Sequence, residues 1–294
     1  MRDQPIEPHA TAARVPGENP PSAPVAESAF GEIAWAEIPP PPPPADEGTG
    51  APQSRSGRRA PRTDWRLGGR TVLRWREWLI AASLLALGAG VLCSAALAML
   101  NPAGWTAIAA SIVPLVAMLV VVVWAFSMSR PAGLLRVRGI DVLYGLVLGG
   151  ALRVVQGWLS AGDAASGAFP SLLRVDGRVP AGTWITDVLA PVTVAPVIEE
   201  LFFRGVLLVS VYTVLRRPLG KVSAGVVAVV VSTLAFAIAH SLAAGSGAVV
   251  GVALLGLVCA LLVMLTGRIW GAVLVHIVYN AMFVALALVG TFWG

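Results

Sequence analysis

Long apolar runs follow one another from residue 78 to the end of the chain, with short polar segments between them. An α-helix needs about 20 apolar residues to cross a bilayer, and these runs are close to that length. A longer run, 184–215, is interrupted by Pro191 and Pro196. The pattern predicts an all-α fold, a polytopic membrane helical bundle of about seven transmembrane helices. We expect the spans at about 79–100, 105–126, 140–159, 184–215, 222–242, 249–266 and 269–293.

Residues 1–77 have a different composition, rich in Pro, Ala, Gly and Arg, with six consecutive prolines at Pro39–Pro44. Such a segment buries too little apolar surface to offset the entropy of ordering. We therefore expect a disordered Pro-rich cytoplasmic tail over 1–77 and a transmembrane domain over 78–294. The proline run should form a polyproline II helix, and a protein partner for the tail stays open.

Charge changes this picture only in detail. The chain is 56% hydrophobic and 13% charged, about half the charge content of a soluble domain. The net charge of +5 comes from arginines and lysines beside the expected spans, so the predicted partner is the lipid bilayer and not nucleic acid. The loops 127–139 and 216–221 are basic, whereas 101–104 carries no charge. This alternation predicts an integral plasma membrane protein with a cytoplasmic N-terminus.

Two acids and an arginine nevertheless stand inside the run 184–215. Ionisable groups are costly in a bilayer, so Glu199, Glu200 and Arg204 are candidates for function. Glu200 and Arg204 are four residues apart and can pair on one helical face. Glu199 is rotated by about 100° from Glu200 and is expected to face a cavity, although the sequence alone allows the two acids to exchange roles.

Two further patterns have helical spacing, Phe236-x-x-x-His240 and His276-x-x-x-Asn280. Taken singly, each pattern has a structural explanation, because a buried Glu–Arg pair or a lone histidine often only joins helices. Three such patterns in order, on separate apolar segments, are better explained by a site.

Together, EExxxR, FxxxH and HxxxN resemble the motifs of the CAAX-protease and bacteriocin-processing (CPBP, or Abi) family of intramembrane endopeptidases. The resemblance covers about 184–290, and the neighbouring text FFRG (202–205) and TGRIWGAVLVHIVYNA (266–281) also fits. It implies hydrolysis of peptide bonds in membrane-associated proteins or peptides, as in CAAX-type prenyl proteases. The substrate, and whether it carries a prenyl group, cannot be read from the residues.

The resemblance also implies a role for each motif residue. Glu199 would activate a water molecule that His240 shares or orients, and Arg204 would hold Glu200. Hydrogen bonds to the tetrahedral oxyanion would come from His276 and Asn280. Phe236 would shape the substrate pocket. The predicted catalytic residues are Glu199, Glu200, Arg204, His240, His276 and Asn280.

The cofactor requirement and the class of protein stay open at this point. The family has been described both as metalloproteases and as glutamate-type proteases. A divalent metal such as zinc would take Glu199, His240 and His276 as ligands, but the chain has no HExxH motif and a metal-free site is favoured. The alternatives are a non-catalytic membrane scaffold or immunity protein, and a transporter that uses the same buried charges.

One feature of the spacing does not fit a simple bundle. His240 lies 18 residues beyond Val222, whereas His276 lies 7 beyond Ile269. If both helices begin at the same membrane surface, the two histidines differ in depth by about 16 Å. Either a tilted or recessed helix brings them together, or the expected boundaries are wrong and the helix with His240 begins later than Val222 and continues toward Gly245 and Gly247.

Overall fold

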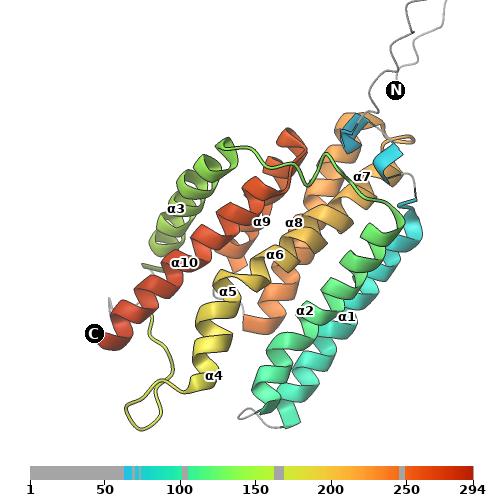
Figure 1. Cartoon of the computed structure of the whole chain (residues 1–294). Helices are drawn as coiled ribbons and strands as arrows, with labels where there is room; N and C mark the ends of the chain where they lie inside the picture. Colours follow the sequence, from blue (N-terminus) through green and yellow to red (C-terminus); the bar gives the residue numbers. More distant parts are fainter. Residues whose placement is uncertain are drawn as a thin grey trace, which may run out of the picture. The chain divides into compact units, whose positions relative to one another are not determined.

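The computed structural model describes residues 63–67, 70–72, 74–100, 105–161, 169–244 and 249–293. The proline run and most of the expected tail lie outside these described residues. Six helices in the described part are long and apolar enough to cross a membrane. They are α1 (Glu77–Leu100), α2 (Trp105–Met128), α3 (Ile140–Ala161), α8 (Gly220–Ala244), α9 (Val249–Thr266) and α10 (Trp270–Phe292) (Figure 1). The predicted all-α, multi-span membrane bundle is therefore confirmed.

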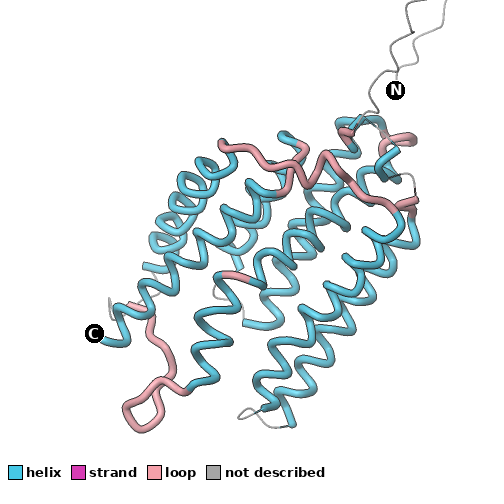
Figure 2. Tube along the Cα trace, viewed as in Figure 1, coloured by secondary structure: helices cyan, strands magenta, loops and turns pink. Residues whose placement is uncertain are grey.

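The remaining expected span, 184–215, is divided into short pieces. We call Ala181–Leu215 the segmented helix. Its break falls at Thr193, whose φ and ψ are −117° and −72°, and Figure 2 shows a short loop there. Pro196 lacks an N–H, so the carbonyl of Val192 receives no helical hydrogen bond. The pieces are α4 (Ala181–Thr183), the π-helical turn η4 (Trp184–Leu189), α5 (Ala190–Val192), α6 (Val194–Glu200), the π-helical turn η5 (Leu201–Leu208) and α7 (Val209–Leu215).

Helices α3 and α10 pack closely because α3 presents glycines to its partner (Figure 1). A Cβ atom on Gly145 would lie 2.7 Å from the Cβ of Leu274, and one on Gly149 would lie 2.7 Å from the carbonyl oxygen of Val275. Small residues four apart are a common means of close helix packing in membranes. This contact fixes α10, which carries two of the candidate site residues.

The basic loops meet at one end of the bundle, which we call the basic end. The backbone N–H of Ile269 donates to the carbonyl of Leu134 at 3.0 Å, and Arg268 pairs with Asp141 at 2.8 Å. The basic residues of this end in the described part are Arg66, Arg70, Arg74, Arg76, Arg130, Arg136, Arg138, Arg216, Arg217, Lys221 and Arg268.

The structure differs from the expected tail at residues 63–76. Trp65 and Trp75 are fully buried, and the indole N–H of Trp65 donates to the carbonyl of Gly267 at 3.1 Å. The Arg66 guanidinium donates to the carbonyls of Met264 and Leu265, which are left without helical partners at the end of α9. The overall composition of 1–77 hides these two tryptophans, whose burial anchors this short stretch to the bundle.

Candidate active site

Glu200 and Arg204 form the ion pair that their spacing predicts. Arg204 Nη1 lies 2.9 Å from Glu200 Oε1, and neither side chain is exposed. The guanidinium also donates from Nη2 to the carbonyl of Gly256 at 3.0 Å and lies 4.3 Å from the centre of the Phe236 ring. These further contacts offset part of the cost of burying the pair, although Glu200 Oε2 and Arg204 Nε have no hydrogen-bond partner within the described residues. This pair therefore holds α6, η5, α8 and α9 together.

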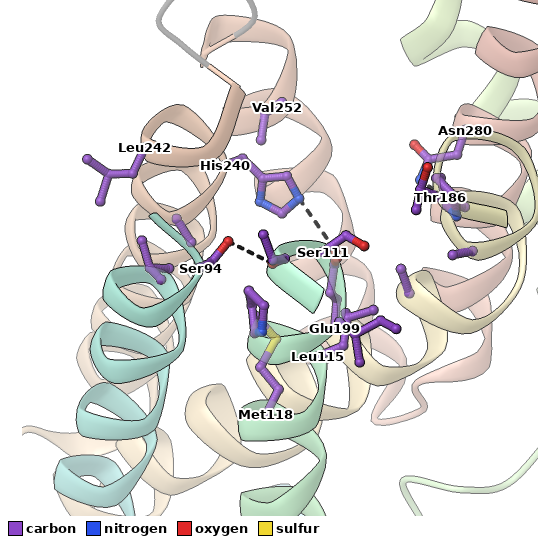
Figure 3. Close-up of a pocket in the computed structure, with 18 of the residues that line it drawn as sticks. Ser94, Ser111, Leu115, Met118, Thr186, Glu199, His240, Leu242, Val252 and Asn280 are labelled. Atoms are coloured by element: carbon purple, nitrogen blue, oxygen red, sulfur yellow. Dashed lines mark hydrogen bonds and ion pairs between the residues drawn. The ribbon is translucent and has the colours of Figure 1, made fainter. Parts of the chain in front are cut away.

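Glu199 points in another direction and lines a cavity of about 970 Å³. Its side chain keeps 12% of its exposure, whereas Glu200 has none. Figure 3 shows Glu199 and His240 joined across the cavity, with Ser94 and Ser111 on the wall formed by α1 and α2. The rotation between adjacent helical positions thus separates a buried acid from a cavity-facing acid.

Two histidines from different helices approach the same oxygen of Glu199. His240 Nε2 on α8 lies 3.5 Å from Glu199 Oε2, and His276 Nε2 on α10 lies 3.8 Å from it. The candidate residues of α6, α8 and α10 are therefore brought together by the fold, although they are as much as 77 positions apart in the sequence.

A recessed start of α10 removes the predicted difference in depth. Ile269 is fully buried, and a Cβ on Gly205 would lie 3.3 Å from its Cδ1. The turn before α10 therefore lies beside Gly205, inside the bundle, with Leu134 and Trp65 covering it. The assumption that α8 and α10 begin at the same level is wrong.

The hydrogen-bond partner of Nδ1 determines which ring nitrogen carries the hydrogen in His240 and in His276. His240 Nδ1 lies 2.9 Å from the carbonyl of Phe236, which can only accept, so Nδ1 carries the hydrogen. His276 Nδ1 lies 3.0 Å from Glu200 Oε1, and the carboxylate paired with Arg204 likewise accepts. In the neutral rings, both Nε2 atoms then present lone pairs toward Glu199. Three acceptors converge, and a proton or a water molecule is needed between them.

Phe236 forms a wall of the site, as its spacing from His240 predicts. Its ring is fully buried, 4.2 Å from the centre of the His240 ring and 5.6 Å from that of His276. Phe203 packs edge-on against it at 5.2 Å. These contacts restrict the rotamers of both imidazoles.

Asn280 lines the same cavity, and its amide donates to the carbonyl of Pro191 at 2.8 Å. This bond ties α10 to the turn that precedes the break in the segmented helix. The spacing of Asn280 from His276 placed it in the site, but no local pattern identifies Pro191 as its partner. The walls from α1 and α2, including Ser94 and Ser111, also carry no sequence signal.

Glu199, His240 and His276 are the three residues that the sequence offers as metal ligands. Within the described residues, no group of three or more His, Cys, Asp or Glu side chains is placed so that it could hold a metal ion. Glu199, His240 and His276 are not found as such a group, and both the favoured metal-free site and the zinc alternative stay predictions.

The bundle and the site define a multi-span membrane protein with acids and histidines gathered at an internal cavity. Residues 181–282 match the family model described as Type II CAAX prenyl endopeptidase Rce1-like. The predicted family is confirmed over this part, about a third of the chain, and the matched segment contains every candidate site residue. Neither the curated proteins nor the solved structures contain a match to this chain. The family supports an intramembrane protease in general.

Proposed function

We propose that this protein is an intramembrane endopeptidase in which Glu199 activates water to hydrolyse a peptide bond of a membrane-associated protein or peptide. The observation that carries the proposal is the position of Glu199, at the cavity wall and facing two imidazoles. Glu200, by contrast, is buried and neutralised by Arg204. A carboxylate with an open side and nearby proton acceptors is suited to general base catalysis.

The three convergent acceptors give the water a place. A water molecule has two hydrogens to donate. Glu199 Oε2 and His240 Nε2 lie 3.5 Å apart, so one water on the cavity side of this pair can donate a hydrogen to each. Glu199 takes one proton as the water oxygen forms its bond to the carbonyl carbon. The C–N bond then breaks, and the proton passes to the leaving amine, with His240 placed to share it.

The developing oxyanion needs donors on the opposite side of the reacting carbonyl. Asn280 Nδ2 has two hydrogens, of which one is bound to Pro191, so the second can serve the oxyanion. His276 can donate from Nε2 only as an imidazolium, with its Nδ1–H held by Glu200. The identity of the substrate, and whether it carries a prenyl group, stay open.

A comparison of cell membranes tests the proposal. Cells express wild type, Glu199→Gln or Glu77→Gln at matched levels, and the labelled N- and C-termini of their proteins are compared by mass spectrometry. Glu77 is an exposed acid at the start of α1 and serves as the control. We expect the same new termini with wild type and Glu77→Gln and none with Glu199→Gln. Identical termini in all three, with each protein folded, would contradict the proposal and favour a membrane scaffold.

A further inference from the structure

The cavity beside Glu199 lies in one half of the bundle. From α1 it takes residues 91–99, near the end of that helix, and from α2 residues between 108 and 118, near its beginning. Helix α8 contributes its last turns, with Leu242, and α9 its first turns, with Val252. Because α1 and α8 run away from the basic end and α2 and α9 run toward it, all these segments belong to the opposite half.

The half between Glu199 and the basic end is filled instead. After the acids, the chain toward α7 places Phe202 and Phe203 in the core without exposed surface. Trp65 and Leu134 are fully buried beside the turn before α10. The Trp65 indole donates to the carbonyl of Gly267, and the carbonyl of Leu134 accepts from the N–H of Ile269. The large side chains buried to more than 98% in this half are Trp65, Trp75, Leu79, Leu134, Phe202, Phe203, Leu207, Leu208 and Ile269. The described residues therefore block approach to Glu199 from the basic end.

Charge distinguishes the two ends in the same way. The described part of the basic end has eleven basic residues and only three acids, Asp64, Glu77 and Asp141. At the opposite end, the described loop 169–180 is close to neutral, with two arginines and one aspartate. Arginine and lysine in short loops mark the cytoplasmic side of a membrane protein. The cavity half is then the outer half.

We propose that the substrate reaches Glu199 from the extracytoplasmic side of the membrane. The occupant is a peptide segment with apolar side chains, carried by an exported chain or by the outer juxtamembrane part of a membrane protein. The cavity lining suits an apolar peptide segment. Apart from the catalytic groups, the lining is mainly Ala, Val, Leu, Ile, Met and Phe. A cytoplasmic C-terminal tail does not reach this cavity. The inference rests on the proposed function for the chemistry, but the side of access can be measured separately.

The side of access is tested with single cysteines in the full-length chain. Cys93 and Cys259 are first replaced by alanine, which leaves no native thiol. Ser94→Cys and Ser111→Cys then report on the cavity, and Arg217→Cys reports on the basic end. A membrane-impermeant methanethiosulfonate is applied to spheroplasts, whose outer face is exposed, and to inverted vesicles, whose cytoplasmic face is exposed.

We expect the two cavity cysteines to react in spheroplasts and Arg217→Cys to react only in inverted vesicles. Cavity cysteines that react only in inverted vesicles, or in neither preparation, would overturn the proposal. So would reaction of Arg217→Cys in spheroplasts. The labelling is repeated with Glu199→Gln, where the same pattern is expected because accessibility does not require turnover. A failure of sidedness is thereby distinguished from a failure of hydrolysis, which only the analysis of termini reports.

Discussion

Glu199 and Glu200 are adjacent and chemically identical, yet their surroundings assign them different tasks. Glu200 is enclosed with Arg204 and orients His276, whereas Glu199 faces the cavity. The pairing could be predicted from a spacing of four residues, because the α-helix repeats every 3.6 residues. The bond from Asn280 to Pro191 could not, since it depends on where α10 crosses a break in another helix.

The two acids should therefore differ in their effect on stability. Glu200→Gln leaves the fully buried Arg204 guanidinium without its counter-charge, and we expect it to destabilise the protein by about 3–5 kcal/mol. Glu199→Gln removes a cavity-facing charge and should change the free energy of unfolding much less. Thermal unfolding in detergent measures both. Equal losses of stability in the two variants would contradict the division of roles.

The metal-free interpretation concerns the same group of residues. Because the chain has no HExxH motif and Glu199 is placed to act as the general base, we expect cleavage by the wild type to continue in the presence of EDTA or 1,10-phenanthroline. Loss of cleavage with either chelator, restored by added zinc, would contradict this expectation.

At the scale of helices, the apolar runs predicted six long helices closely, because run length alone decides what can span a bilayer. The recessed start of α10 could not be predicted in this way. It depends on packing of Ile269 against Gly205 and Leu134, which come from distant parts of the chain. Pro191 and Pro196 indicated that the run 184–215 is interrupted. They did not indicate that the carbonyl of Pro191 accepts a hydrogen bond from Asn280.

The contact between α3 and α10 gives a prediction with a matched control. Gly149→Val would place its Cβ 2.7 Å from the carbonyl oxygen of Val275, which is backbone and cannot give way. We expect a loss of about 1–3 kcal/mol in stability. Gly157→Val on the same helix meets no atom within 4 Å and should have little effect. Unfolding midpoints in detergent compare the two, and similar midpoints would show that α3 does not need this close approach.

In the molecule as a whole, residues 63–67, which precede α1, are attached to the end of α9, some 200 positions later. The Asp64 carboxylate accepts hydrogen bonds from the Arg66 side chain at 2.8–3.2 Å and keeps that guanidinium directed at the carbonyls of α9. Composition indicated the Pro-rich segment but not this attachment, because the three tryptophans of residues 1–77, Trp35, Trp65 and Trp75, barely change an average.

The attachment predicts a pH dependence. The hydrogen bond from Arg66 holds the pKa of Asp64 below its ordinary value. A lowered pKa means that the stabilisation is present above the unfolded value, near 3.9, and is lost as pH falls through the folded value. At pH 7 we expect Asp64→Asn to lose at most about 1 kcal/mol, because the pair is partly exposed. Unfolding midpoints of variant and wild type should converge below about pH 4. A difference that stays constant down to pH 3 would contradict this assignment.

The most direct test asks whether water activated at Glu199 cleaves a peptide bond. Wild type and Glu199→Gln are purified, reconstituted in liposomes and incubated in H₂¹⁸O with a substrate identified from the cellular termini. The account predicts that wild type produces new C-termini carrying ¹⁸O and that Glu199→Gln, folded to the same extent, produces none. New C-termini from Glu199→Gln at the wild-type rate, or termini without ¹⁸O from the wild type, would contradict it.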